Sequence, residues 1–262
     1  MNGILNVQIN ITQDKPEINR KKVEHFIKKY SDKTLDLVVL PENFSLYDTD
    51  GCLLQETLEF FVSIAKKFNT NIVAGSIVEK DGEKFYNTSY VFDRTGNLAG
   101  KYRKIHLLDF IGEKESENLS SGEDFVVVEL DFAKIGLAIG YDLRFPMMYK
   151  NLSNSGADII VQPSMWTVPN EIYEDEESLR YAQGMWVALN RTRAYDNQIY
   201  LVTSNQTKQI SEISSAIGCS LIVSPTSEVL ANAKNDQCAV YAKVDIQAAR
   251  YYRNLCPIAN ID

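Results

Sequence analysis

The stretch that decides the fold is residues 134–146, KIGLAIGYDLRFP. Its apolar run, 135–139, predicts a buried strand, and the residues that follow predict a sharp exit from the sheet. A strand that ends in a tight turn is a place where an enzyme can hold a strained, exposed nucleophile. At this turn the chain has Gly140, which carries no side chain.

The composition is that of an ordinary globular domain. The chain has 262 residues, of which 45% are hydrophobic and 24% charged, close to the average for soluble domains. We expect one α/β domain over residues 1–262. The net charge of −8 argues against a nucleic-acid partner. No run of 18 apolar residues and no signal peptide are found, so we expect no membrane partner and a cytoplasmic location.

The cysteines and histidines exclude two kinds of site. Cys52, Cys219, Cys238 and Cys256 form no C-x-x-C pair, so we expect free thiols in a reducing compartment. With only His25 and His106 present, neither a metal site nor a Ser–His–Asp triad is credible, and we interpret His106 as structural. No metal or organic cofactor is expected.

Hydrophobic periodicity predicts alternating strands and helices. The expected helices are 16–29, 54–68, 145–155 and 179–196. The expected strands are 5–9, 35–40, 72–77, 87–92, 99–104, 125–130, 135–139, 159–162, 199–204, 220–223 and 240–245. The turn signal at 93–97 predicts a hairpin. This order indicates mixed sheets with helices outside them.

Three charged residues stand out near strand ends. Glu42 follows strand 35–40 in VVLPENF, where α/β folds build their sites; Pro41 would fix the turn that aims it. Lys104 lies in KYRKIHLLD, and Glu115 in EKESENLSSGEDF, where Glu117 competes with it. The alternative for each is a solvated surface charge. If buried, Glu42 and Lys104 would neutralise one another.

The segment around Gly140 closely resembles the nucleophile segment of the nitrilase superfamily (carbon–nitrogen hydrolases), in which this position is the catalytic Cys. The resemblance covers roughly residues 4–250 and implies a four-layer α-β-β-α sandwich. Further matching blocks follow in family order: Tyr86-Asn87-Thr88, Tyr141-Asp142, Arg144-Phe145-Pro146, Gly156-Ala157-Asp158, Pro163, Trp166, Arg191, Arg193 and Asn197.

The resemblance implies a role for each charged residue. Glu42 corresponds to the general base, and Lys104 to the cation that stabilises the oxyanion. Glu115 corresponds to a second glutamate that positions the Lys and the substrate, and the spacing to the Leu119-Ser120-x-Gly122 turn favours it over Glu117. Tyr141, Arg144 and Trp166 are expected to bind substrate.

The resemblance also implies a substrate class and an assembly. The PENF, IHLLD and LRFPM details resemble the amidase branches that act on small amides and carbamoyl amines. A small-molecule amide or carbamoyl amine is therefore the expected partner. Further copies of the chain, in a homodimer or a higher homo-oligomer, are also expected, since homodimers are the family habit.

The departure at Gly140 removes the first step of the thiol chemistry, so we expect a chain that is inactive or strongly impaired. Cys219 could replace the nucleophile, but a free Cys on an apolar strand is more often a core residue. Attack by a water that Glu42 activates is chemically possible. A non-catalytic protein that binds a small amide or amine in the same pocket is the other function class. Whether Gly140 is natural or introduced stays open.

A second departure is the acidic segment 170–178, NEIYEDEES. Its acidic residues suit the start of a helix in solvent. The alternative is a lid that favours a cationic substrate. Its acidic members are Glu171, Glu174, Asp175, Glu176 and Glu177.

Overall fold

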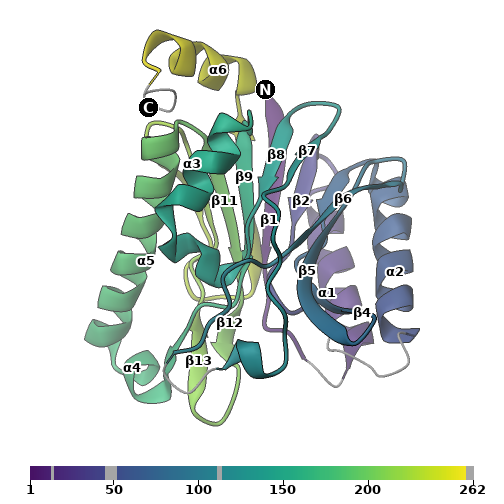
Figure 1. Cartoon of the computed structure of the whole chain (residues 1–262), viewed down its shortest axis with the longest axis vertical. Coiled ribbons are helices and arrows are strands. Elements are labelled where there is room, and N and C mark those ends of the chain that lie inside the picture. Colours follow the sequence, from purple (N-terminus) through teal and green to yellow (C-terminus); the bar gives the residue numbers. More distant parts are fainter. Residues whose placement is uncertain (13–14, 45–51, 111–113, 258–262) are drawn as a thin grey trace.

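Two large β-sheets lie against one another and carry helices on their outer sides (Figure 1). The computed structural model describes residues 1–12, 15–44, 52–110 and 114–257. Helices α3 (Pro146–Asn154) and α5 (Glu176–Asn197) lie on one side, and α1 (Pro16–Lys29) and α2 (Cys52–Phe68) on the other. This is the four-layer α-β-β-α arrangement that the resemblance implies, and the fold prediction is confirmed.

The first sheet has seven strands within the described residues. Their order is β16-β1-β2-β3-β5-β4, and β6 pairs with β5. Parallel pairing joins β1 to β2 and β2 to β3. The bounds are β1 (Asn2–Gln8), β2 (Leu37–Val39), β3 (Asn71–Val73), β4 (Ile77–Asp81), β5 (Lys84–Phe92), β6 (Leu98–Arg103) and β16 (Cys238–Val244).

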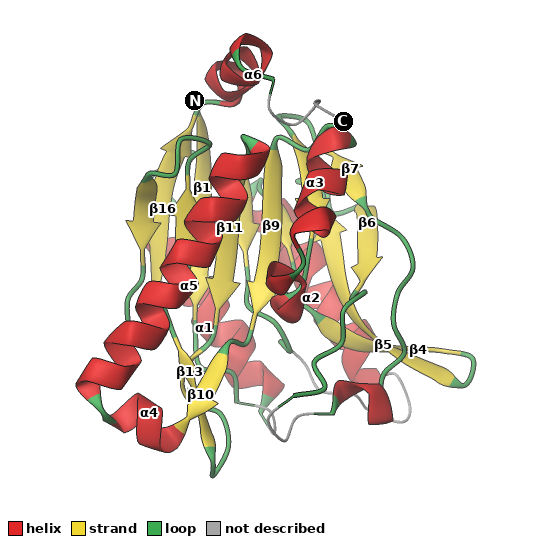
Figure 2. Cartoon of the chain, turned by 60° about the vertical axis from the view of Figure 1, so that its left-hand side comes forward, coloured by secondary structure: helices red, strands yellow, loops and turns green. Residues whose placement is uncertain are grey.

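The second sheet has six described strands in the order β15-β14-β11-β9-β8-β7. Its centre, β11-β9-β8, is parallel. The bounds are β7 (Val127–Glu129), β8 (Lys134–Leu137), β9 (Ile159–Ser164), β11 (Tyr200–Asn205), β14 (Leu221–Val223) and β15 (Val229–Asn232). Figure 2 shows α5 and α3 running across this sheet.

Alternation along β2 divides the core. Leu37 and Val39 belong to the apolar cluster that includes the second sheet, whereas Val38 belongs to the cluster formed with α1 and α2. Successive side chains of a strand point to opposite faces, so this strand is buried on both sides. That is why 35–40 reads as a nearly continuous apolar run.

The hairpin at 93–97 and the long helices are confirmed, but one expected strand is wrong. The range 72–77 covers the end of β3 and the first residue of β4, which are separated by residues 74–76 around Gly75, whose φ is +67°. A β-carbon at Gly75 would lie 2.1 Å from the carbonyl oxygen of Pro41. The chain therefore bends here, next to the turn that carries Glu42.

Several short elements are additional to the prediction. A small sheet in the order β10-β13-β12 comprises β10 (Thr167–Pro169), β12 (Thr207–Gln209) and β13 (Ser214–Ile217). Helices α4 (Asn170–Glu174) and α6 (Ile246–Leu255) complete the described elements together with the 3₁₀ turns Glu115–Glu117 and Gly140–Arg144. The acidic segment thus spans α4 and the start of α5, where Asp175 caps the helix by accepting from the Ser178 N–H.

Candidate active site

The candidate site lies where strands of both sheets end. Glu42 follows β2, Lys104 follows β6, Gly140 follows β8 and Met165 follows β9. The Glu42 N–H donates to the carbonyl oxygen of Ser164 at 3.3 Å, which joins the end of β2 to the end of β9. The two sheets therefore bring residues far apart in sequence to one place.

The carboxylate of Glu42 is buried and accepts three hydrogen bonds. Its Oε1 accepts from Lys104 Nζ and from Asn87 Nδ2, both at 2.9 Å. Its Oε2 accepts from the Met165 N–H at 2.9 Å. Only 3% of Glu42 and 2% of Lys104 is exposed. A buried ion pair of this kind is tolerated because its remaining polar atoms are satisfied.

Glu115 joins this pair from the other side of Lys104. Lys104 Nζ donates to Glu115 Oε1 at 2.8 Å, and the Leu108 N–H donates to Glu115 Oε2 at 2.7 Å. Glu117 instead pairs with Lys114 on the surface. The structure thus brings Glu42, Lys104 and Glu115 together.

The electrostatics of this triad favour a charged lysine. Burial raises the pKa of Glu42, and Lys104 opposes that shift. For Lys104, burial would lower the pKa, but the carboxylates of Glu42 and Glu115 outweigh it and raise the pKa above the ordinary value. The lysine is therefore a fixed cation held between two carboxyl groups.

Gly140 lies directly against Glu42. It begins the 3₁₀ turn Gly140–Arg144 with φ of +47°, a conformation that glycine adopts without strain. A β-carbon built on Gly140 would lie 2.4 Å from Glu42 Oε2. Gln162 Nε2 donates to the Gly140 carbonyl at 3.1 Å, which holds the turn against β9.

The fully buried side chain of Asp142 holds the 3₁₀ turn Gly140–Arg144 in place. Its Oδ2 accepts from the Ile139 N–H at 2.7 Å and from Tyr102 Oη at 2.8 Å. Its Oδ1 lies 2.7 Å from His106 Nδ1. The His106 ring stacks on Phe145 with centroids 3.6 Å apart. These contacts agree with a structural role for His106.

The three residues expected to bind substrate lie near the site at different depths. Tyr141 is partly buried with its ring edge on Phe145, whereas Arg144 is exposed. Trp166 is partly buried and packs against Trp186 with ring centroids 5.0 Å apart. Their substrate contacts stay predictions, as do the catalytic roles of the charged residues.

Cys219 belongs to the core. It is 4% exposed and lies in the apolar cluster of the second sheet. Its N–H donates to the Lys234 carbonyl, and its own carbonyl accepts from Trp186 Nε1. Burial raises the pKa of its thiol to about 11. A neutral, buried thiol is a poor nucleophile.

Two residues of the site carry no role in the sequence interpretation. Asn87 enters the sequence interpretation only as part of a matching strand, and Met165 does not enter it, yet both donate to Glu42. The Met165 donor is a backbone N–H, so its side chain gives no sequence signal. Asn87 Oδ1 is buried with no hydrogen-bond partner among the described residues.

Neither a metal site nor a membrane-spanning helix is found among the described residues. Among the described residues, no group of three or more His, Cys, Asp or Glu side chains is placed to hold a metal ion. Within the same ranges, no helix combines the length and apolar character needed to cross a membrane.

Comparison with known proteins identifies the family of this chain. The model of the carbon-nitrogen hydrolase family matches residues 6–254. The chain belongs to the carbon–nitrogen hydrolase family. It is 33% identical to omega-amidase NIT2-B of Xenopus laevis over 252 residues, 92% of this chain and 87% of the relative. It is 32% identical to the 2-oxoglutaramate amidase of Bacillus subtilis over 262 residues, 96% of this chain and 94% of the relative.

Solved structures of carbon–nitrogen hydrolases have the same fold. Nit3 of Saccharomyces cerevisiae, described as a member of branch 10 of the nitrilase superfamily, superposes with a TM-score of 0.81 at 29% identity, covering 98% of this chain and 94% of Nit3. The carbon-nitrogen hydrolase of Helicobacter pylori G27 superposes with a TM-score of 0.88 at 24% identity over 100% and 95% of the two chains. The nitrilase-superfamily resemblance of the sequence is thus confirmed.

Proposed function

We propose that this carbon–nitrogen hydrolase has a site for a small amide or carbamoyl amine that lacks the nucleophile of Cys-Glu-Lys thiol chemistry. The observation that carries the proposal is the contact of Glu42 with Gly140. A charged pair suited to amide hydrolysis lies at the strand end, and the residue there has no atom that can attack a carbonyl carbon. The chain is therefore expected to be inactive or strongly impaired as a thiol amidase.

The groups that remain suit part of the reaction. In the thiol route, a Cys attacks the amide carbon, a Glu takes the thiol proton and passes it to the leaving amine, and a Lys helps to hold the oxyanion. Water then hydrolyses the thioester. Here Glu42 would be the proton carrier and Lys104 the cation that faces the oxyanion, but no thioester can form at Gly140.

The relatives point to a substrate class. Omega-amidase and 2-oxoglutaramate amidase name enzymes that act on small amides, which makes the amide of a small dicarboxylic acid the first candidate. The acidic residues of α4 and α5 would instead favour a cationic amine. The Asp175 cap of α5 supports the structural interpretation of that segment.

A second candidate function is binding without turnover. The contact that favours it is again at Gly140, because Glu42 Oε2 already lies in the space that a side chain at this position would need. The oxygens of Glu42 also have three protein donors, so the triad is complete without a thiol. A ligand that occupies the same pocket would then be held and released unchanged.

Two measurements on the unaltered chain test the proposal. Calorimetry with 2-oxoglutaramate and with an N-carbamoyl amine measures binding, and ammonia release measures turnover. We expect saturable binding of one class and ammonia release close to the uncatalysed rate. Rapid ammonia release would contradict the loss of the thiol route, and the absence of binding to both classes would contradict the amide site.

Assembly and location complete the proposal. A homodimer in the cytoplasm is expected, with no nucleic-acid or membrane partner. Size-exclusion chromatography with light scattering decides the first point, and a monomer would contradict it.

A further inference from the structure

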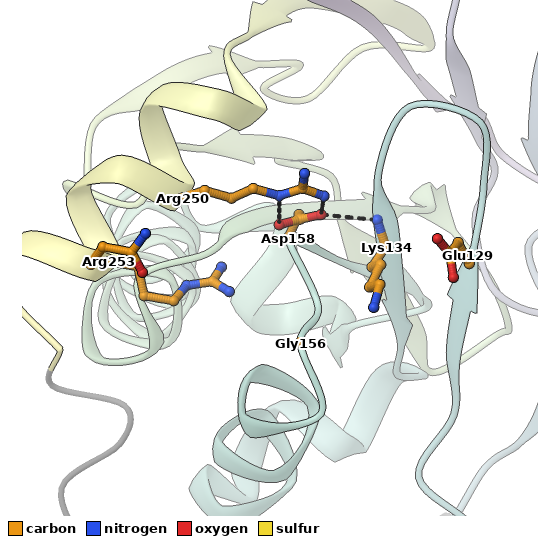
Figure 3. A pocket seen from close by; sticks show the side chains of 7 residues that line it. Glu129, Lys134, Gly156, Asp158, Arg250 and Arg253 are labelled. Atoms are coloured by element: carbon orange, nitrogen blue, oxygen red, sulfur yellow. Dashed lines mark hydrogen bonds and ion pairs between the residues drawn. The ribbon is translucent and has the colours of Figure 1, made fainter.

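A cavity of about 450 Å³ opens far from the candidate active site, beneath α6 (Figure 3). It lies at the amino-terminal ends of β8 and β9, since its lining includes Lys134 at the start of β8 and Asp158 just before β9. The candidate active site lies at the opposite ends of these strands. Six residues of strand span roughly 20 Å, so the cavity is a separate place. The other lining residues are Glu129, Gly156, Arg250, Arg253 and Asn254.

The cavity gathers positive charge in an acidic protein. Three cations line it, Lys134, Arg250 and Arg253, against two carboxylates, Glu129 and Asp158, whereas the whole chain has a net charge of −8. An excess of positive charge at a concave place attracts anions, because low-dielectric walls concentrate the field there.

Asp158 is already occupied by its own partners. Arg250 Nε donates to its Oδ1 at 2.9 Å, and Arg250 Nη2 donates to its Oδ2 at 2.6 Å. The Lys134 N–H donates to the same Oδ2 at 3.0 Å. Asp158 thus forms its ion pair with Arg250, and its hydrogen bonds go to Arg250 and to the Lys134 backbone rather than to the side chains of the other two cations.

Arg253 and Lys134 lack acidic partners among the described residues. Arg253 Nη2 donates to the carbonyl oxygens of Ala157 and Gln198, and its buried Nε has no hydrogen-bond partner there. Burial lowers the pKa of Arg253, Asp158 opposes that shift, and the neighbouring Arg250 adds to it, so the net direction is downward. Figure 3 shows Arg253 and Lys134 on opposite sides of the segment that carries Gly156 and Asp158.

Gly156 lies beside the Lys134 stem in a backbone conformation that favours glycine. Its φ is +89°, and a β-carbon built there would lie 3.8 Å from Lys134 Cδ. The lysine stem therefore passes over a residue without a side chain, and its ammonium group can reach the cavity.

We propose that this cavity binds a compact oxyanion, such as a phosphate or a small carboxylate, between Arg253 and Lys134. Arg253 Nη2 already donates to two backbone carbonyls, so the donor to the oxyanion would be Nη1, which has no hydrogen bond among the described residues. The ammonium group of Lys134 adds a second point of charge. Because Arg253 lies on α6 and Lys134 on β8, a bound oxyanion ties the last described helix to the second sheet. Glu129 at the edge of the cavity weakens binding by repulsion.

The test is a titration of the full chain with inorganic phosphate and, in a separate arm, with succinate, each at an ionic strength held constant with sodium chloride. Isothermal calorimetry gives the dissociation constant, and the melting temperature reports stabilisation. We expect a saturable rise in melting temperature. The stronger of the two arms identifies the type of oxyanion.

Three variants test the charge dependence of binding: one should weaken it, one should strengthen it, and one is a control. Lys134→Gln should weaken binding at least fivefold, while Glu129→Gln should strengthen it at least twofold. Lys84→Gln, an exposed strand lysine in the other sheet, should leave the dissociation constant unchanged. The Lys134 side chain makes no hydrogen bond or ion pair with the described residues, so Lys134→Gln should fold normally. The melting temperature measured without phosphate checks this. Absence of saturation in both arms, or equal binding by Lys134→Gln and the unaltered chain, would overturn the proposal.

Discussion

Glu42 Oε2 lies 2.4 Å from the place where a β-carbon of residue 140 would be. Glycine is favoured at this position for two reasons, the close approach of Glu42 and a φ of +47°. Gly140→Ala should therefore lower the free energy of unfolding by more than the ~1–3 kcal/mol that a left-handed residue alone costs. Denaturant unfolding measures the change.

Gly82→Ala is the matched control for this substitution. Gly82 has φ of +61°, but no atom lies within 4 Å of its missing β-carbon. The decrease in free energy of unfolding of Gly82→Ala should therefore reflect backbone strain only. Equal losses for the two variants would show that Glu42 moves freely, contrary to the packed site described above.

Removal of the buried cation should destabilise the fold. Lys104→Met leaves Glu42 buried without its charge partner, and breaking a buried pair in this way typically costs about 3–5 kcal/mol. The double variant Lys104→Met/Glu42→Gln should recover part of that loss, because the most deeply buried carboxylate is then neutral and only the more exposed Glu115 lacks its cation. Unfolding in urea measures the stability of the unaltered chain and of both variants.

Lys114→Met is the control for charge removal at the surface. Lys114 pairs with Glu117, and both side chains are more than half exposed. Such pairs contribute little, so this variant should unfold like the unaltered chain. A loss from Lys104→Met no larger than that from Lys114→Met would contradict a buried, mutually dependent triad.

Glu79 should make stability depend on pH. Burial would raise its pKa, but hydrogen bonds from Tyr90, Arg103 and Lys101 outweigh burial and lower the pKa below the ordinary value of 4.5. A lowered pKa in the folded state stabilises the fold above the unfolded pKa, and that contribution is lost as the pH falls through the folded value. This network anchors β6, the strand that leads to Lys104.

The comparison of the unaltered chain with Glu79→Gln isolates this effect. Their difference in free energy of unfolding should be largest near about pH 6 and should shrink toward about pH 3. A difference that stays constant over this range would show that the Glu79 pKa is the same in the folded and unfolded states.

Thiol labelling should separate Cys219 from Cys256. Cys219 is buried, with a pKa raised to about 11, whereas Cys256 is exposed. Near pH 8, iodoacetamide should modify Cys256 quickly and Cys219 only after unfolding. Peptide mass spectrometry distinguishes the two sites. Rapid modification of Cys219 in the native protein would reopen its candidacy as a nucleophile.

The sequence predicts those parts of the fold that have a strong local signal. Helix 16–29 has a proline at its start and a clear apolar face, and the structure has α1 at the same bounds. The prediction of strand 72–77 is wrong, because the chain bends at Gly75 close to the carbonyl of Pro41, a contact that no local pattern reveals. The strands of the small sheet are three or four residues long, too short for a periodic signal.

The candidate site divides in a similar way. The resemblance selects Glu42, Lys104 and Glu115, whose charged side chains stand out in matching blocks. It does not indicate the Met165 N–H, which lies 123 positions from Glu42 and acts through the backbone. The packing of Glu42 into the space left open at Gly140 also depends on two strand ends meeting in space.

The most direct test compares ammonia release by the unaltered chain and by Gly140→Cys on 2-oxoglutaramate and an N-carbamoyl amine. Loss of a nucleophile costs many orders of magnitude, so once Glu42 has moved aside for the new side chain, we expect activity at least about 100-fold above the unaltered chain. Iodoacetamide should abolish that gain. If the unaltered chain instead releases ammonia as fast as Gly140→Cys and resists iodoacetamide, a different nucleophile is at work and the account of a site that lacks only its thiol is wrong.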